Sequence, residues 1–369
     1  MALLSPVIPL IALWLPLAAC APDDDPDLLP IPEAASGDET APSWYRPPAT
    51  AERWAPELHS PDGWTFTPTV TPDFRRVYYA RWDAPDFNDP SSIQELWTAE
   101  WDEASGAWTA ERVEATAGWR VDWPHVAPDG ERFFLSYIKP HPGQYNYPDG
   151  LDAPRGVQVG DFDLWSGAMT ADGRVDWDTF LPIDGPDINR QKTPENALVR
   201  YVHNETAPRT TLDGDLYFWT ERLDDGGGRR DVYRAAADGT GGYQPPELLP
   251  FNTSRRESGV SVDPEGRWVI FASEGLGGEG QSDLFVVVRD GDGWGEPVNL
   301  GPAVNSPFSD DSPEVSPDGQ TLFFSTARPG PDAPYVDAGE GGGPAIGPHW
   351  VDLTAVEPFR RATGLVADG

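Results

Sequence analysis

The sequence has little positive charge and almost no cysteine. Lys and Arg together number 26 in 369 residues, against 61 Asp and Glu, so the formal charge at pH 7 is -35. A chain of this charge should repel nucleic acid and anionic lipid surfaces, so we expect no nucleic-acid partner. The acidic residues are typical of a solvated surface that keeps a protein soluble. With Cys20 as its one cysteine, the chain cannot form an internal disulfide.

Familiar catalytic and cofactor motifs are also missing. The sequence has no HExxH, no GxSxG, no phosphate-binding loop and no dinucleotide glycine signature, and its five histidines show no ligand spacing. Asp290-Gly291-Asp292-Gly293 resembles part of a calcium loop but lacks the downstream Glu, and is more typical of a hairpin turn. The sequence therefore predicts no catalytic residue and no cofactor.

Long apolar runs are limited to the N-terminus. Residues 3–19 are apolar but short and broken by three prolines, which indicates an export signal rather than a membrane span. Leu17-Ala18-Ala19-Cys20 ends this run and resembles the lipobox of bacterial lipoproteins. The resemblance implies a signal peptide over 1–20, lipidation of Cys20, and, with Ala21 next, an anchor in the outer membrane.

A low-hydrophobicity segment follows. Residues 21–43 are rich in Pro, Asp, Glu, Ala and Ser, and cannot bury enough apolar surface to fold. We expect a disordered tether here and a folded domain over 44–369.

Five copies of one unit make up the rest of the chain. Each has a turn like Ser316-Pro317-Asp318-Gly319 followed by an apolar strand like Thr321 to Ser325. Pro fixes φ, Asp bonds the backbone and Gly tolerates positive φ, which together predict hairpins. The turn acids, which we expect to be structural, are Asp73, Asp129, Asp213, Glu265 and Asp318. The repeat cores lie near 65–113, 121–182, 205–250, 257–300 and 310–353.

All-strand repeats of this length are typical of propeller blades. The runs SPDG, LFFS, DLF, DGDGW and EPVNLG resemble the WD40-like PD40 repeat of TolB-type propellers, over roughly residues 54–353. The resemblance implies an all-β propeller with four-stranded blades. The copies indicate five blades, or six if the long second interval hides a degenerate one. Trp54 to Leu58 resembles a fourth strand and should close the ring by completing the last blade, with Glu357-Pro358-Phe359 as the competitor.

The long connections should gather on one face. The insertions 83–93, 139–161 and 328–348 follow second strands, and 183–204 joins two blades on the same side. Such loops on a rigid ring favour binding, although neutral insertions would look the same. The most distinctive loop, 139–161, offers contacts to carbohydrate or peptide, or packing against a neighbouring blade, through His141, Tyr145, Tyr147 and Arg155.

Acidic residues recur where first strands begin. First strands line the channel of a propeller, so these carboxylates could meet at its mouth, raise one another's pKa values, or bind a cation such as calcium. The alternative is hydrogen bonding to the backbone, which we favour. Blade one breaks the series with Thr65. The acids are Glu205, Glu257 and Asp310, with Asp122 and Asp311 one residue off.

Two functions fit this sequence. The first is a monomeric, lipid-anchored scaffold of the cell envelope, without enzymatic activity, that holds a protein or a wall polysaccharide. The second is a glycan-active enzyme, since five-bladed propellers also house glycosidases, which need two carboxylates in a central pocket. A deep axial pocket with two carboxylates and aromatic walls would favour the enzyme. A channel filled by side chains would favour the scaffold.

Overall fold

The chain divides into two units, Met1–Ala35 and Ser36–Gly369, and this description concerns the second. The structure, a computed structural model, describes residues 41–61, 63–83, 93–139, 162–191, 202–222, 230–329, 335–336, 343–344 and 346–365. The predictions for Cys20, the tether and the loop residues His141, Tyr145, Tyr147 and Arg155 lie outside the described residues, apart from the last three positions of the tether.

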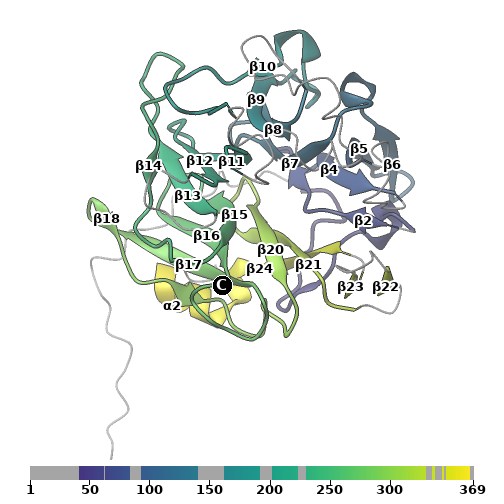
Figure 1. The fold of residues 1–369 in the computed structure, drawn as a ribbon. Coiled ribbons are helices and arrows are strands. Elements are labelled where there is room, and N and C mark those ends of the chain that lie inside the picture. Colours follow the sequence, from purple (N-terminus) through teal and green to yellow (C-terminus); the bar gives the residue numbers. More distant parts are fainter. Residues whose placement is uncertain are drawn as a thin grey trace, which may run out of the picture. The chain divides into compact units, whose positions relative to one another are not determined.

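The second unit is a five-bladed β-propeller of antiparallel, four-stranded blades (Figure 1). Blade 1 comprises a split first strand, β2 (Trp64–Thr65) and β3 (Thr69–Val70), then β4 (Arg76–Trp82), β5 (Glu95–Asp102) and β6 (Ala107–Arg112). Blade 2 comprises β7 (Val121–Val126), β8 (Arg132–Tyr137), β9 (Asp163–Ala168) and β10 (Leu181–Pro182). Blade 3 comprises β11 (Thr206–Thr210), β12 (Leu216–Thr220), β13 (Asp231–Ala235) and β14 (Glu247–Leu248).

The last two blades follow the same order. Blade 4 comprises β15 (Glu257–Val262), β16 (Trp268–Ser273), β17 (Asp283–Asp290) and β19 (Val298–Asn299), with β18 (Gly293–Trp294) extending the outer hairpin. Blade 5 comprises β20 (Asp310–Val315), β21 (Thr321–Thr326), β24 (Gly347–Asp352) and β1 (Glu52–Arg53). A small pair, β22 (Tyr335–Val336) and β23 (Gly343–Pro344), stands apart. The prediction of five blades is confirmed.

The N-terminal segment closes the ring. In β1, Glu52 lies opposite Trp350 and Arg53 opposite His349, so the outer strand of blade 5 comes from the start of the domain. Closure by an N-terminal strand is therefore confirmed, but the strand lies just before the predicted Trp54 to Leu58. Pro56–Leu58 forms a 3-10 helix instead. The competing segment lies in helix α2 (Glu357–Thr363), whose Phe359 packs edge-on against Trp268.

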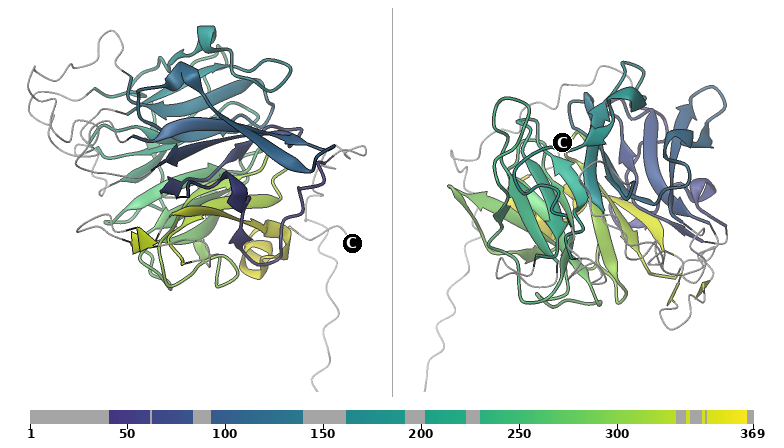
Figure 2. Two further views of the ribbon diagram at one scale, coloured as in Figure 1. Left: turned by 90° about the vertical axis from the view of Figure 1, so that its right-hand side faces the viewer. Right: turned by 45° about the horizontal axis from the view of Figure 1, so that its top comes forward.

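The blades pack face to face around the ring (Figure 2). The second strands β12, β16 and β21 are buried at every position, because both faces of each are covered by neighbouring blades. Aromatic rings fill the gaps between blades, as where Tyr78 of blade 1 meets Phe133 of blade 2 at 4.9 Å between centroids. Among the described residues, no helix is long and apolar enough to cross a membrane.

The repeat turns form as the sequence predicts. Gly130, Gly214, Gly266 and Gly319 all have positive φ. In the first copy Phe74 takes this left-handed conformation, at φ 56°, and its ring packs on Tyr45.

The turn acids hold these hairpins. The carboxylates of Asp73, Asp129 and Asp318 each accept a hydrogen bond from the backbone N–H two residues on, and Glu265 pairs with Arg267. Asp213 lies in the turn closed by the bond from Gly214 N to Thr211 O.

Candidate functional site

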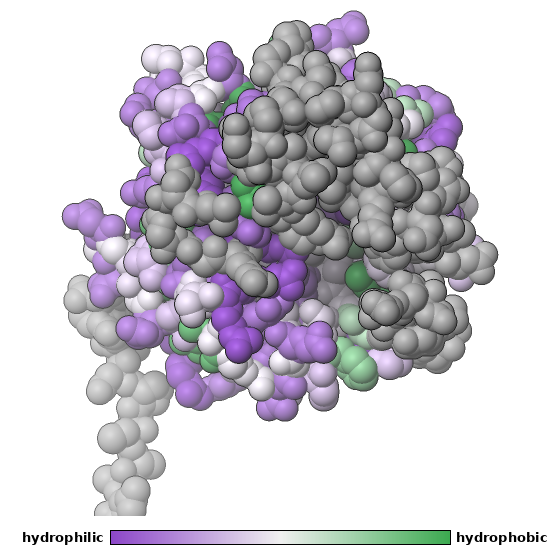
Figure 3. Space-filling view, in the orientation of Figure 1, coloured by the Kyte–Doolittle hydropathy of each residue, from purple (hydrophilic) through white to green (hydrophobic). Residues whose placement is uncertain are grey.

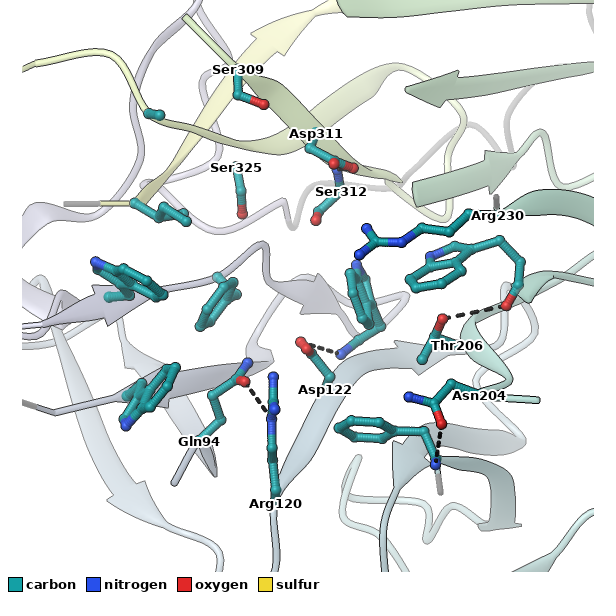
Figure 4. A pocket seen from close by; sticks show the side chains of 18 of the residues that line it. Gln94, Arg120, Asp122, Asn204, Thr206, Arg230, Ser309, Asp311, Ser312 and Ser325 are labelled. Carbon is teal, nitrogen blue, oxygen red and sulfur yellow. Dashed lines mark hydrogen bonds between the residues drawn. The ribbon is translucent and has the colours of Figure 1, made fainter. Parts of the chain in front are cut away.

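A pocket of about 370 Å³ lies on the axis, where the first strands begin (Figure 4). All five blades contribute to its wall. Its aromatic lining is Trp64, Phe66, Trp82, Trp123, Phe162 and Trp219. Its charged lining is Arg120, Asp122, Arg230, Arg256 and Asp311. A concave site with apolar walls and a few convergent polar groups is the usual form of a ligand pocket.

Irregular first strands shape this pocket. In blades 2 to 5 the ladder between first and second strands shifts register just after the strand begins. The residue at each shift has positive φ, and these residues are Trp123, Ala207, Gly259 and Ser312. Such bulges bend a strand and re-aim neighbouring side chains. The residues just before three of these shifts, Asp122, Thr206 and Asp311, line the pocket.

The pocket lies on the face from which the long connections leave. Several lining residues stand beside these connections: Trp82 ends β4, Phe162 precedes β9, Arg230 precedes β13, and Ile346 precedes β24. In the orientation of Figure 1, the described surface is mainly hydrophilic with scattered apolar residues (Figure 3).

Asp122 is buried in the wall, with an exposed fraction of 5%. Its Oδ1 accepts a hydrogen bond from Trp123 N at 3.1 Å. Burial raises the pKa of Asp122 to about 6, against the opposing effects of Arg120 and Gln94. Arg120 donates from Nε to Gln94 Oε1 at 2.7 Å and lies over the ring of Phe162. Asp122 is therefore a carboxyl group that is half protonated near pH 6, well above the range of an ordinary aspartate.

Asp311 enters the pocket from blade 5. Its carboxylate accepts hydrogen bonds from Ser312 N at 2.6 Å and Ser258 Oγ at 3.1 Å. Burial raises its pKa, whereas these bonds and the charges of Arg230 and Arg256 lower it. A Cβ on Gly259 would lie 2.6 Å from Asp311 Oδ1, so a glycine there leaves room for the carboxylate. The charge of Asp311 also contributes to the raised pKa of Asp122, so the two carboxyl groups interact electrostatically.

The other three predicted acids do not line the pocket. Glu205, Glu257 and Asp310 are fully buried. Glu257 accepts hydrogen bonds from Thr253 N and Ser273 Oγ at 2.8 Å, and Asp310 accepts one from Ser306 N at 2.7 Å and pairs with Arg328. Glu205 lies 3.6 Å from Arg222 Nη2. These acids hold connections and strand ends in place, as in the second of the two interpretations above, in which the carboxylates form structural hydrogen bonds. In blade 1, Thr65 likewise accepts a bond from Ser60 N.

A buried ionic network fills the channel further along the first strands. His125 Nδ1 lies 2.9 Å from Glu314 Oε1, and Arg209 pairs with the other oxygen of Glu314. Thr210 N donates to His125 Nε2 at 3.1 Å, so the proton of the neutral ring is on Nδ1 and is donated to Glu314. Burial lowers the pKa values of both His125 and Arg209. The axis thus holds a pocket at one mouth and packed side chains at its centre.

Within the described ranges, no group of three or more His, Cys, Asp or Glu has an arrangement suited to a metal ion. The predicted ring of five acids is divided between the pocket, which takes two, and the blade interfaces. No motif or spacing in the sequence pointed to the aromatic lining or to Arg120, Arg230 and Arg256 as pocket residues. The one available hint was the one-residue offset of Asp122 and Asp311 from the other acids.

The fold defines the chain as a five-bladed β-propeller. No protein-family model and no curated protein matches it. Among solved structures it is similar to TolB from Acinetobacter baumannii, with a TM-score of 0.41 and 15% identity over 78% of this chain and 57% of that one. It is also similar to a thermostable family-43 glycoside hydrolase, with a TM-score of 0.45 and 13% identity over 79% of this chain and 90% of that one.

A third similar structure is an N-acetylgalactosamine deacetylase from F. plautii, with a TM-score of 0.44 and 12% identity over 89% of this chain and 99% of that one. The chain spans little more than half the length of TolB. At these identities the likeness concerns the fold alone.

Proposed function

We propose that the protein is a lipid-anchored propeller of the cell envelope that binds a saccharide unit of an envelope glycan in its axial pocket. The observation that carries this proposal is the lining of the pocket, in which six aromatic side chains surround carboxylate, guanidinium and amide groups. Sugar rings present C–H faces that pack on aromatic rings, and hydroxyl groups that bond to charged and amide side chains.

The shape of the channel favours the end of a glycan or a side branch. The network of His125, Arg209 and Glu314 is buried and occupies the axis beyond the pocket. A polymer entering from the open mouth meets this network and cannot thread through the ring. The pocket volume of about 370 Å³ lies within the range of small-molecule sites.

The envelope location rests on the sequence. The lipobox-like Leu17 to Cys20 and the tether after it support an exported lipoprotein held near glycan at the outer membrane. The charge of -35 supports a ligand other than nucleic acid.

Binding to defined oligosaccharides tests the proposal. The full-length protein in detergent would be titrated by calorimetry with cellobiose, xylobiose, mannobiose, chitobiose and digalacturonate. We expect one of them to bind, and Trp123→Ala and Trp64→Ala to weaken it at least about tenfold through loss of stacking. Trp294→Ala is the matched control, because Trp294 is also partly buried but packs on Phe251 outside the pocket lining. No binding to any member, or equal weakening by the control, would contradict the proposal.

A further inference from the structure

We propose that the axial pocket also cleaves the glycan it binds, by hydrolysis of a glycosidic bond with Asp122 as general acid and Asp311 as general base. This inference rests on the proposed saccharide binding and goes beyond it. The two carboxyl groups come from β7 and β20, in blades that are not neighbours, and enter the pocket from different sides (Figure 4). Glycoside hydrolysis needs two carboxyl groups that flank the scissile bond in different protonation states.

These two acids differ from the other buried acids of the first strands. Glu257 and Asp310 accept several hydrogen bonds from connecting segments and lie outside the pocket lining. Asp122 and Asp311 each stand immediately before the left-handed residue of a bulge, Trp123 and Ser312, whereas Glu257 and Asp310 stand two residues before it. The residue at this position also lines the pocket in blade 3, where it is Thr206, so the position before the bulge directs both carboxyl groups toward the pocket.

Trp219 adds a hydrogen-bond donor to the residues that line the pocket. Its side chain lines the pocket and is 2% exposed. Among the described residues, its indole Nε1 finds no hydrogen-bond partner. A buried N–H group is costly when it is unsatisfied, so an acceptor such as a sugar oxygen would complete it.

The surroundings assign the two roles. Asp122 lines the pocket together with Trp123 and Phe162, and burial raises its pKa to about 6, which suits a proton donor. Asp311 accepts hydrogen bonds from Ser312 N and Ser258 Oγ and is near two guanidinium groups. Burial raises the pKa of Asp311 overall, and these contacts, which favour its ionised form, suit a base.

The proposed step balances without any further reactant. Water attacks the anomeric carbon, and the new C–O bond forms as the bond to the leaving oxygen breaks. Asp311 accepts the proton that the attacking water loses, while Asp122 gives its proton to the leaving oxygen. Exchange with solvent then returns Asp311 to the carboxylate and Asp122 to the acid. The products are two shorter saccharides, one with a new reducing end.

Two leaving groups separate the roles of the two acids. The full-length protein would be incubated with the oligosaccharide found to bind and with the p-nitrophenyl glycoside of its non-reducing sugar. p-Nitrophenolate is a good leaving group that departs without being protonated. The leaving oxygen of a sugar needs a proton from the general acid. We expect Asp122→Asn to lower kcat at least about 100-fold on the oligosaccharide and less than about tenfold on the aryl glycoside. Asp311→Asn should lower kcat at least about 100-fold on both.

The pH profile and a control carboxylate complete the test. Because Asp122 must be protonated, kcat/KM on the oligosaccharide should fall as pH rises through about 6, and this limb should be absent in Asp122→Asn. Glu265→Gln is the control, since burial also raises the pKa of Glu265 but it lies in a hairpin turn outside the pocket lining. Its turnover should equal that of the wild type.

The outcomes distinguish the two proposals. If no oligosaccharide binds, the proposed function fails. If one binds but no product forms in wild-type protein across the pH range, saccharide binding stands and hydrolysis is overturned. Hydrolysis that survives unchanged in both Asp variants would also overturn the assignment.

Discussion

At the scale of single residues, the contacts at the seam between the first and last blades hold the ring of His59 in its neutral form. Arg53 donates from Nε to His59 Nδ1 at 2.9 Å, and His59 Nε2 lies 2.7 Å from Trp54 O. An arginine Nε–H can only donate, so Nδ1 accepts and Nε2–H donates to the carbonyl. Burial, followed by the charge of Arg53, lowers the pKa of His59 from 6.5 to about 3. The folded seam therefore requires a neutral ring.

This arrangement predicts a loss of stability in mild acid. The pKa of His59 is lower in the folded state, so its contribution is complete above about 6.5 and is lost as pH falls toward 3. His59→Gln keeps one donor and one acceptor but does not titrate. Between pH 6.5 and 5, denaturant unfolding should show wild type losing about 2 kcal/mol more than the variant. Parallel pH profiles for the two proteins would show that the ring is not held neutral.

The sequence allowed acids at first-strand starts to be predicted, but not which of them reach the pocket. Side chains alternate direction along a strand, so the one-residue offset between Asp310 and Asp311 separates a structural carboxylate from a pocket carboxylate. The bulge at Ser312 that fixes this direction depends on contacts between blades, such as Ser258 Oγ with Asp311. The sequence of one strand does not show these contacts, so it could not predict which acid faces the pocket.

At the scale of elements, the residues on both sides of the two-residue closing strand β1 also hold the ring closed. Trp54 next to it is 1% exposed and packs edge-on against Phe323 of blade 5 and near Trp108 of blade 1. The segment before it also bonds to the ring, through Ser43 to Glu103 and Asp352 N to Pro48 O. The seam between the first and last blades is therefore held by residues 43 to 58.

Two truncations test this closure. Removing residues 21–40 should leave the melting temperature almost unchanged, because all of the seam contacts above begin at Ser43. Removing 21–58 deletes β1 and Trp54 and exposes the edge of β24, so melting should fall by about 10 °C or more, or the protein should aggregate. Calorimetry of both truncated proteins and of Trp54→Ala provides the measurement. Equal melting temperatures for the two truncated proteins would show that residues 41–58 do not close the ring.

The repeating elements were the most predictable part of the chain. The Pro-Asp-Gly turns, the strands after them and the closure from the N-terminus all follow from local chemistry repeated five times. The boundaries of the closing strand were less predictable, because Trp54 looks like a strand residue although it serves as an anchor after the strand has ended. Its place is set by contacts with Trp108 and Phe323, which lie far away in the sequence, and with Trp44.

At the scale of the whole molecule, we expect a soluble acidic ring held at a membrane by lipid. The lipobox-like sequence around Cys20 lies outside the repeats, so Cys20→Ser should leave melting unchanged while moving the protein from the membrane fraction to the soluble fraction. Fractionation with mass spectrometry of the N-terminal peptide provides the measurement. A Cys20→Ser protein that stays in the membrane with the same acyl mass would refute the anchor.

The central claim is that the axial pocket is a saccharide site, and the position of a bound sugar tests it most directly. Crystals of the protein would be grown with the oligosaccharide that binds in calorimetry, using Asp122→Asn to prevent turnover. We predict electron density for a sugar ring inside the axial pocket, packed against the ring of Trp123 or Trp64, with a hydroxyl or glycosidic oxygen within hydrogen-bond distance of residues 122 and 311. Density for the sugar on another face of the ring, with the pocket filled by water alone, would contradict it.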